Sequence, residues 1–230
     1  KDANINCNVY TSPHIQKINE RYEYNNQEIS DEELSRLLLK VKEINNNDKI
    51  TYFEILTAAF FYEANKYKDN INIVEAGLFH RFDATNIIKS NLASIVTAIG
   101  LDHLDWLPKN EQTIDKIIFE KTSSLLNSKI IISKQNSNEI IDKIKDSIKK
   151  NSSDQLIFGN DFNYSLNENG FFYYEDKYGG LKLPLPNLEG EFQLSNISTA
   201  IATIRNIEEI NVSDQNIKNG IKKIKSIARF

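Results

Sequence analysis

The chain has 230 residues, a formal net charge of −4 and 26% charged residues, a length that suits one large domain or two small ones. Its hydrophobic fraction of 40% is ordinary for a globular protein and argues against disorder. The small acidic excess gives no overall attraction for nucleic acid or an anionic membrane, and no apolar stretch reaches the roughly 20 residues that a membrane span needs.

Two residue counts bear on where the chain works and on its completeness. The chain contains one cysteine, Cys7, and no methionine, not even at position 1. A single cysteine cannot form an internal disulfide, which favours a reducing, cytoplasmic location. Because translation starts with methionine, we expect the sequence to be an internal piece of a longer protein.

Short apolar runs alternate with longer amphipathic ones, which is typical of a wound α/β sheet. In chain order, the sequence predicts a strand at 5–10, a helix at 31–44, a helix after Thr51, strands at 71–74 and 94–99, a helix at 111–126, a strand at 129–133, a helix at 138–149, a strand at 155–159, an antiparallel ribbon at 162–185 and helices at 194–208 and 213–224. We therefore expect an α/β fold: a mostly parallel, doubly wound sheet flanked by helices, with a small antiparallel ribbon, in one domain over 1–230.

Local signals support two helix starts and two turns. Ser30 with Glu33, and Thr51 with Glu54, have the spacing of a capping box, in which each side chain caps a backbone N–H of the other residue. In the ribbon, the turn candidates are Asn169-Gly170 and Gly179-Gly180.

Polar residues follow three of the predicted strands, and ligands of open α/β sheets gather beyond the carboxyl ends of strands. Ser12 follows strand 5–10, Glu75 follows strand 71–74, and Asp102 with His103 follows strand 94–99. A hydroxyl, a carboxylate and an imidazole can complete part of a divalent-cation shell. Each also has a structural interpretation: Ser12 as a turn residue, His103 as a satisfied half-buried histidine, and Glu75 as a paired carboxylate.

Other candidates are more simply explained by packing or solvation. His14 and His80 have weaker context, and Cys7 lies within an apolar strand. The lysine-rich run 218–225 has apolar residues at helical spacing, which favours a solvated helix face over a nucleic-acid site. We expect no nucleic-acid or membrane partner.

Several collinear motifs together resemble the folylpolyglutamate synthase/dihydrofolate synthase branch of the Mur ligase superfamily. They are V-Y-T-S-P-H-I (9–15), I-N-E-R (18–21), T-Y-F-E-I-L-T-A-A-F (51–60), E-A-G-L-F-H-R-F-D-A-T-N (75–86), I-G-L-D-H (99–103), F-E-K (119–121), L-E-G-E-F-Q-L-S-N-I-S-T-A (188–200) and A-R-F (228–230). They span nearly the whole chain, and the peptidoglycan ligases of the superfamily carry different sequences in place of Y-T-S-P-H and D-A-T-N.

The resemblance implies an ATP-dependent ligase that joins L-glutamate to dihydropteroate or to a (poly)glutamyl folate. In such enzymes ATP phosphorylates the substrate carboxylate, and the amine of glutamate attacks the acyl phosphate. The implied cofactors are ATP and Mg²⁺, with Mn²⁺ as a good substitute because histidine is an unusual ligand for Mg²⁺. The family is mostly monomeric, so we expect a monomer.

The resemblance also assigns roles to individual residues. Ser12, Glu75 and His103 would be the metal ligands. Lys121, matching a lysine that the family often carbamylates, would be catalytic together with His103. Asn196 and Arg229 would hold the nucleotide, Arg229 through its affinity for phosphate.

The chain also departs from the family pattern. Phe79-His80 replace a glycine pair, Phe192 stands where histidine is common, and the spacing from His103 to Lys121 is longer by three residues around Pro108-Lys109-Asn110. No G-x-x-x-x-G-K-[ST] loop occurs in the sequence. We therefore expect a central ATP-binding domain without the N-terminal phosphate-loop segment or the C-terminal glutamate-binding domain, and inactive by itself.

Two other functions fit parts of the pattern. One is a non-catalytic scaffold or partner-binding protein on a degenerate Mur-ligase fold. The other is a Mur-type ligase that makes a cell-wall precursor.

Overall fold

The structure is a computed structural model that describes residues 2–148, 154–167 and 170–224. The chain divides into two compact units, here called unit 1 (Ala3–Ile87) and unit 2 (Ile88 onward, together with Asp2). Asn216 accordingly donates through Nδ2 to the Asp2 carbonyl at 2.7 Å. The single domain expected over 1–230 stays a prediction.

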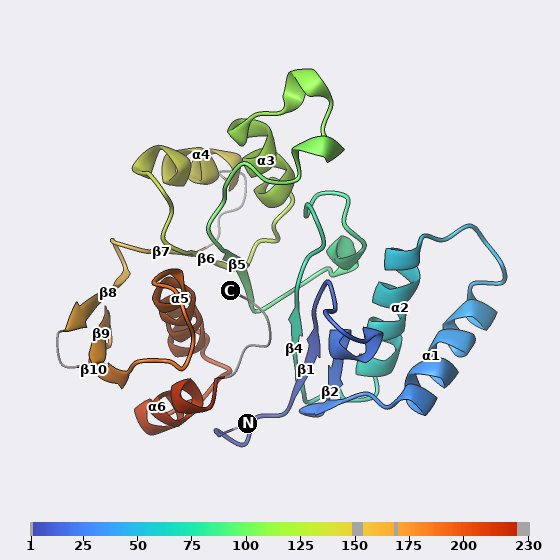
Figure 1. Cartoon of the computed structure of the whole chain (residues 1–230), viewed down its shortest axis with the longest axis horizontal. Helices are drawn as coiled ribbons and strands as arrows, with labels where there is room; N and C mark the ends of the chain where they lie inside the picture. Colours follow the sequence, from blue (N-terminus) through green and yellow to red (C-terminus); the bar gives the residue numbers. More distant parts are fainter. Residues whose placement is uncertain (1, 149–153, 168–169, 225–230) are drawn as a thin grey trace. The chain divides into compact units, whose positions relative to one another are not determined.

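Unit 1 is built on a four-stranded sheet in the order β3-β2-β1-β4. β1 and the edge strand β4 pair in parallel, with Tyr10 opposite Val74, whereas β2 runs antiparallel to β1. Figure 1 shows the two helices of this unit side by side. Its elements are β1 (Cys7–Tyr10), the 3-10 helix η1 (Ile18–Arg21), β2 (Tyr22–Tyr24), β3 (Gln27–Glu28), α1 (Asp31–Ile44), α2 (Tyr52–Ala64), β4 (Ile71–Val74) and the 3-10 helix η2 (Ala84–Ile87).

The hairpin β2–β3 was not among the predicted elements. Its turn is Asn25-Asn26, where φ is +52° and +66°. Asparagine tolerates this left-handed conformation, and two consecutive positive φ angles suit the twist of a tight hairpin. The alternating run Y-E-Y (22–24) before the asparagines is therefore typical of a strand, although no strand was predicted there.

Both predicted capping boxes are confirmed. The Glu33 N–H donates to Ser30 Oγ at 3.2 Å while Glu33 Oε2 accepts from the Ser30 N–H at 3.2 Å. At α2, Glu54 Oε2 accepts from the Thr51 N–H at 2.7 Å. These pairs satisfy backbone donors that the first turn of a helix leaves unpaired, which explains why both helices begin where the sequence predicts.

A ladder of buried tyrosines joins the sheet of unit 1 to α2. The Tyr22 hydroxyl donates to the Leu56 carbonyl at 3.1 Å, and the Tyr24 hydroxyl donates to the Phe60 carbonyl at 3.4 Å. Tyr10 stacks on the ring of Phe60 with centroids 5.1 Å apart. The ladder buries the aromatic rings and gives each phenol a partner, so this core holds the carboxyl end of β1 in place.

Unit 2 contains a parallel sheet in the order β5-β6-β7. Ile131 of β6 belongs to the same buried cluster as Ile197 and Ile201 of α5, and Figure 1 shows α3 and α4 on one side of this sheet and α5 on the other. Successive residues of a strand face opposite sides, so both faces of β6 are apolar. The elements are β5 (Ala93–Val96), the 3-10 helices η3 (Leu104–Trp106) and η4 (Lys109–Glu111), α3 (Ile114–Thr122), β6 (Lys129–Ile132), α4 (Asn138–Ile148) and β7 (Gln155–Ile157).

The predicted ribbon is an antiparallel sheet in the order β10-β9-β8, followed by two helices. Its elements are β8 (Phe162–Asn167), β9 (Phe171–Asp176), β10 (Gly179–Pro184), α5 (Phe192–Asn206) and α6 (Asp214–Lys223). The turn prediction at Gly179-Gly180 is wrong, because Gly179 already pairs with Asp176 and the turn is Lys177-Tyr178. The other turn candidate includes Asn169, which lies outside the described residues.

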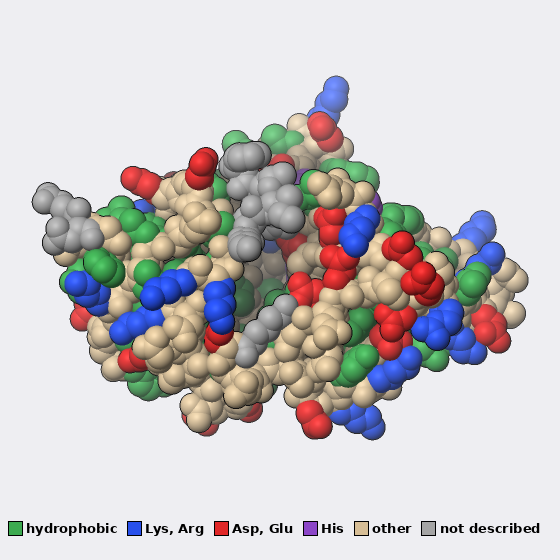
Figure 2. Space-filling view, turned by 60° about the horizontal axis from the view of Figure 1, so that its bottom comes forward, with side chains coloured by type: hydrophobic (Ala, Val, Ile, Leu, Met, Phe, Trp, Pro, Cys, Tyr) green, Lys and Arg blue, Asp and Glu red, His purple; other side chains and the backbone are tan. Residues whose placement is uncertain are grey.

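The predicted fold class is confirmed: parallel strands flanked by helices, with small antiparallel sheets beside them. Within the described ranges, none of the helices has the length and apolarity to cross a membrane. Figure 2 shows basic and acidic side chains both present on the face in view.

Candidate functional site

Ser12 and Glu75 lie together at the carboxyl ends of two parallel strands. The Ser12 N–H donates to Glu75 Oε2 at 2.8 Å, and the Glu75 N–H donates to the Tyr10 carbonyl at 2.9 Å. Both residues are half-buried. The pairing of Tyr10 with Val74 sets this arrangement, because it brings the residues after β1 and β4 to one edge of the sheet.

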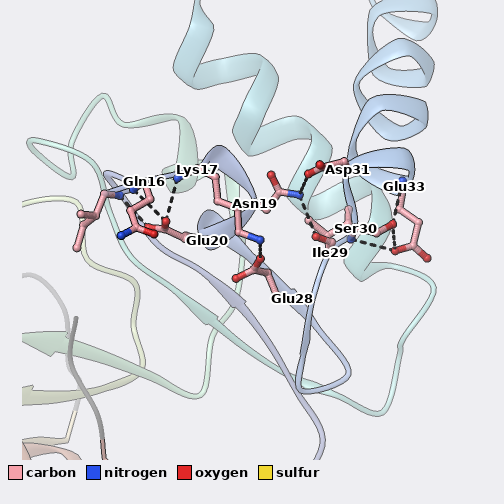
Figure 3. A network of polar contacts seen from close by, with 10 residues as sticks. Gln16, Lys17, Asn19, Glu20, Glu28, Ile29, Ser30, Asp31 and Glu33 are labelled. Carbon is pink, nitrogen blue, oxygen red and sulfur yellow. Dashed lines mark hydrogen bonds and ion pairs between the residues drawn. The ribbon is translucent and has the colours of Figure 1, made fainter. Parts of the chain in front are cut away.

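The loop 11–17 that carries Ser12 is anchored by the residues of η1. Glu20 accepts backbone N–H bonds from Ile15, Gln16 and Lys17 at 2.8, 2.9 and 2.9 Å, and Figure 3 shows its carboxylate turned toward this loop. The bonds from Ile15 and Lys17 hold the pKa of Glu20 below its usual range, because they stabilise the ionised form.

The second half of the E-A-G…D-A-T-N motif folds back on the first. Asp83 Oδ1 accepts the Gly77 N–H at 3.0 Å, and Asp83 Oδ2 accepts the Thr85 N–H at 2.9 Å. A β-carbon on Gly77 would lie 2.5 Å from Asp83 Oδ1, so a larger residue there would have to displace the Asp83 carboxylate. Burial lowers the pKa of His80, while the Asp83 carboxylate acts in the opposite direction.

His103 belongs to unit 2 and follows β5 in a left-handed conformation, with φ of +56°. Its N–H donates to Asp102 Oδ1 at 2.7 Å, and its Nε2 lies 3.4 Å from Asp102 Oδ2. Both contacts join the Asp102 carboxylate to the residue directly before η3. The metal-ligand role of His103, and its grouping with Ser12 and Glu75, stay predictions.

Lys121 is half-buried near the end of α3. Burial lowers the pKa of Lys121, and the Asp102 carboxylate partly offsets this. A depressed pKa increases the fraction of neutral amine, the form that reacts with carbon dioxide to give a carbamate. The three extra residues predicted between His103 and Lys121 fall at η4, whose N-cap is Pro108.

Of the two residues expected to hold the nucleotide, only Asn196 lies in the described part of the chain. Asn196 is exposed on the first turns of α5, where its Nδ2 donates to Gln193 Oε1 at 3.4 Å. Phe192, in place of the family's usual histidine, begins the same helix and is 54% exposed. Arg229 lies outside the described residues.

In the part of the chain that the structure describes, no three His, Cys, Asp or Glu side chains group closely enough to hold a metal ion. The expected set contains only two such residues, Glu75 and His103, because Ser12 would bind through its hydroxyl. A carboxylate with a hydroxyl neighbour is a suitable donor pair for Mg²⁺ or Mn²⁺. In Glu75, Oε2 is used by the Ser12 N–H, and the second carboxylate oxygen has no such bond to Ser12.

Sequence reasoning missed the structural roles of Glu20 and Asp83. Both residues stand inside quoted motifs, I-N-E-R and D-A-T-N, but received no function there. A signal was present for each: an acidic residue beside a proline-containing loop, and Asp two residues before Thr, a spacing that favours an Asx-turn.

No family model matches the chain. Curated relatives include dihydrofolate synthase/folylpolyglutamate synthase of Haemophilus influenzae, 28% identical over 98% of this chain and 49% of the relative, and that of Escherichia coli, 29% identical over 99% and 51%. The chain therefore spans about half the length of the curated relatives it matches.

Solved structures that match the chain are also named as folate ligases. The bifunctional folylpolyglutamate synthase/dihydrofolate synthase of Yersinia pestis, complexed with AMPPNP and Mn ion, matches all of this chain and 53% of its own with a TM-score of 0.86 and 27% identity. E. coli FolC in complex with DHPP and ADP matches 96% of this chain and 51% of its own, with a TM-score of 0.83 and 28% identity. The resemblance inferred from the motifs is confirmed.

Proposed function

We propose that this chain, which resembles the folylpolyglutamate synthase/dihydrofolate synthase family over nearly its whole length, is the central ATP-binding part of an ATP-dependent ligase. The reaction joins L-glutamate to dihydropteroate or to a (poly)glutamyl folate through an acyl phosphate. The observation that carries this proposal is the match with the E. coli and Y. pestis structures, which contain ADP or an ATP analogue, over at least 96% of the chain.

Ser12, Glu75 and His103 are the proposed ligands of Mg²⁺ or Mn²⁺. Support comes from the chemistry of their side chains and from the contact between Ser12 and Glu75 at 2.8 Å. A bound divalent cation would neutralise the negative charge of the phosphates. The part played by the chain is to hold the Glu75 carboxylate in one orientation, through the Ser12 N–H.

Asn196 and Arg229 are proposed to bind the nucleotide, and Lys121, carbamylated, is proposed to be catalytic together with His103. The lowered pKa of Lys121 supports its modification, because only the neutral amine is nucleophilic. We further propose a monomeric, cytoplasmic parent protein whose partners are small molecules. The matched proteins are named as folate ligases, which supports a folate ligase and favours neither a scaffold nor a cell-wall ligase.

The binding of Mn²⁺, followed by electron paramagnetic resonance, tests the metal site directly. Glu75→Gln should weaken Mn²⁺ binding by more than about 100-fold, since residues that only support a ligand already contribute roughly 10- to 100-fold. Glu33→Gln is the matched control, because Glu33 caps α1 on the same unit through an equivalent bond to a backbone N–H. Equal Mn²⁺ affinity in the wild type and in Glu75→Gln would refute the site.

A further inference from the structure

Loop 11–17 connects β1 to η1 without regular secondary structure, yet most of its backbone donors have defined partners. The carboxylate of Glu20 accepts three consecutive N–H groups, those of residues 15–17, at 2.8–2.9 Å. Figure 3 shows the carboxylate of Glu20, a residue of η1, beside the backbone of Gln16 and Lys17. Bonds of N–H groups to an ionised carboxylate are about twice as strong as neutral ones, so these three bonds clamp the loop.

The beginning of the loop is fastened to the same two residues. The Thr11 N–H donates to the Arg21 carbonyl at 3.1 Å, and the Thr11 hydroxyl donates to the Glu20 carbonyl at 3.2 Å. Arg21, only 7% exposed, donates from Nε to His14 Nδ1 at 3.0 Å. Ser12 thus lies between two anchored points, Thr11 on one side and His14 to Lys17 on the other.

Ser12 passes this restraint to Glu75, since its N–H donates to Glu75 Oε2 at 2.8 Å. A half-buried glutamate on its own samples several rotamers, and ordering its carboxylate costs conformational entropy. A backbone donor held rigidly by the loop selects one rotamer. The second carboxylate oxygen then keeps a fixed direction, which is how residues behind a ligand raise metal affinity.

We propose that Glu20 is a positioning residue for the metal site, which acts by clamping loop 11–17 so that the Ser12 N–H orients the Glu75 carboxylate. This inference rests on the proposed function, because it assumes that Glu75 binds a divalent cation. Glu20 itself makes no contact with the ion in this scheme.

Two variants of Glu20 test the proposal against the control Glu33→Gln. Glu20→Gln exchanges one clamp oxygen for an NH₂ group that faces backbone donors. Glu20→Asp keeps the charge but withdraws both oxygens from the loop. Both should weaken Mn²⁺ binding about 10-fold, and hydrogen exchange at the Ser12 amide should become faster in both. Glu33→Gln should alter helix α1 while leaving the Mn²⁺ affinity and the Ser12 amide unchanged.

The possible outcomes distinguish a failure of the Glu20 proposal from a failure of the proposed metal site. If Glu75→Gln loses Mn²⁺ and neither Glu20 variant does, the role of Glu20 is refuted and the metal site stands. If Glu20→Asp binds Mn²⁺ like the wild type, negative charge alone is sufficient and the positioning role is refuted. If Glu75→Gln also binds like the wild type, both inferences fail together. Far-ultraviolet circular dichroism on each variant establishes that it is folded before Mn²⁺ is added.

Discussion

The carboxylate of Asp83 occupies the space that a β-carbon on Gly77 would need. Asp83 Oδ1 accepts the Gly77 N–H at 3.0 Å, and the added carbon would meet that oxygen at 2.5 Å and the Phe53 ring at 3.1 Å. The glycine and the aspartate of the E-A-G…D-A-T-N motif are therefore one structural unit. A side chain at position 77 would push the Asp83 carboxylate away from the Gly77 N–H.

Gly77→Ala should accordingly destabilise the fold by about 2 kcal/mol, since overpacking typically costs roughly 1–3 kcal/mol. Urea unfolding measures the change. Gly100→Ala is the control, because nothing lies within 4 Å of a β-carbon there. Its free energy of unfolding should stay within about 0.5 kcal/mol of the wild type. Equal losses in the two variants would show that Asp83 moves aside freely.

The buried pair of Arg205 and Asp176 should be far more sensitive than an exposed one. Their side chains are 10% and 1% exposed, with Arg205 Nε 3.3 Å from Asp176 Oδ2. Arg205→Met leaves the carboxylate without its cation and should cost about 3–5 kcal/mol. The control is Lys129→Met, whose partner Asp154 is 66% exposed, with an expected loss of about 0–1 kcal/mol. Thermal or urea unfolding measures both losses of stability, and equal losses in the two variants would contradict the prediction.

Asn8 is fully buried and should be one of the most costly polar residues to remove. Its Nδ2 donates to Asn72 Oδ1 at 2.9 Å, and its Oδ1 accepts from the Asn25 N–H and Asn70 Nδ2 at 3.0 Å each. Asn8→Ala strands these groups, each worth about 1–3 kcal/mol when left unpaired. We expect a loss above about 2 kcal/mol, measured by urea unfolding. A loss no larger than about 0.5 kcal/mol would mean that water replaces the side chain.

The lowered pKa of Lys121 predicts a pH dependence of stability. The unfolded chain holds its proton up to the ordinary lysine pKa of about 10.4, whereas the folded chain releases it earlier because of burial. Between the two pKa values the unfolded state binds more protons, so this group makes stability rise with pH there. In Lys121→Met that contribution should vanish. Urea midpoints of both proteins between pH 8 and about 10.5 test it, and identical pH profiles would contradict the prediction.

Local signals predicted the helix starts and most strands of the fold. Ser30 and Glu33 form, within four residues, the capping box at which α1 begins. The apolar run 129–133 contains the buried strand Lys129–Ile132. Less was predictable where an element ends. Strand 94–99 stops at Val96 because the chain then turns away, and the Ile99 N–H pairs with the Gln135 side chain instead of a strand.

The candidate site was predictable only as residue types at strand ends. Its internal organisation depends on bonds that join residues far apart or on opposite sides of a loop, such as Ser12 to Glu75 across 63 positions. Spacing carries no information on which carboxylate will bind a loop and which will face a cation. Glu20 and Glu75 have the same chemistry, and only the folded chain distinguishes them.

The tyrosine ladder of unit 1 restricts how its helix and sheet can slide. The hydroxyls of Tyr22 and Tyr24 hold the carbonyls of Leu56 and Phe60, which are four residues apart in α2. The next equivalent pair of carbonyls along the helix lies about 5.4 Å away. A displacement of α2 along the sheet by less than this distance would therefore break both hydrogen bonds.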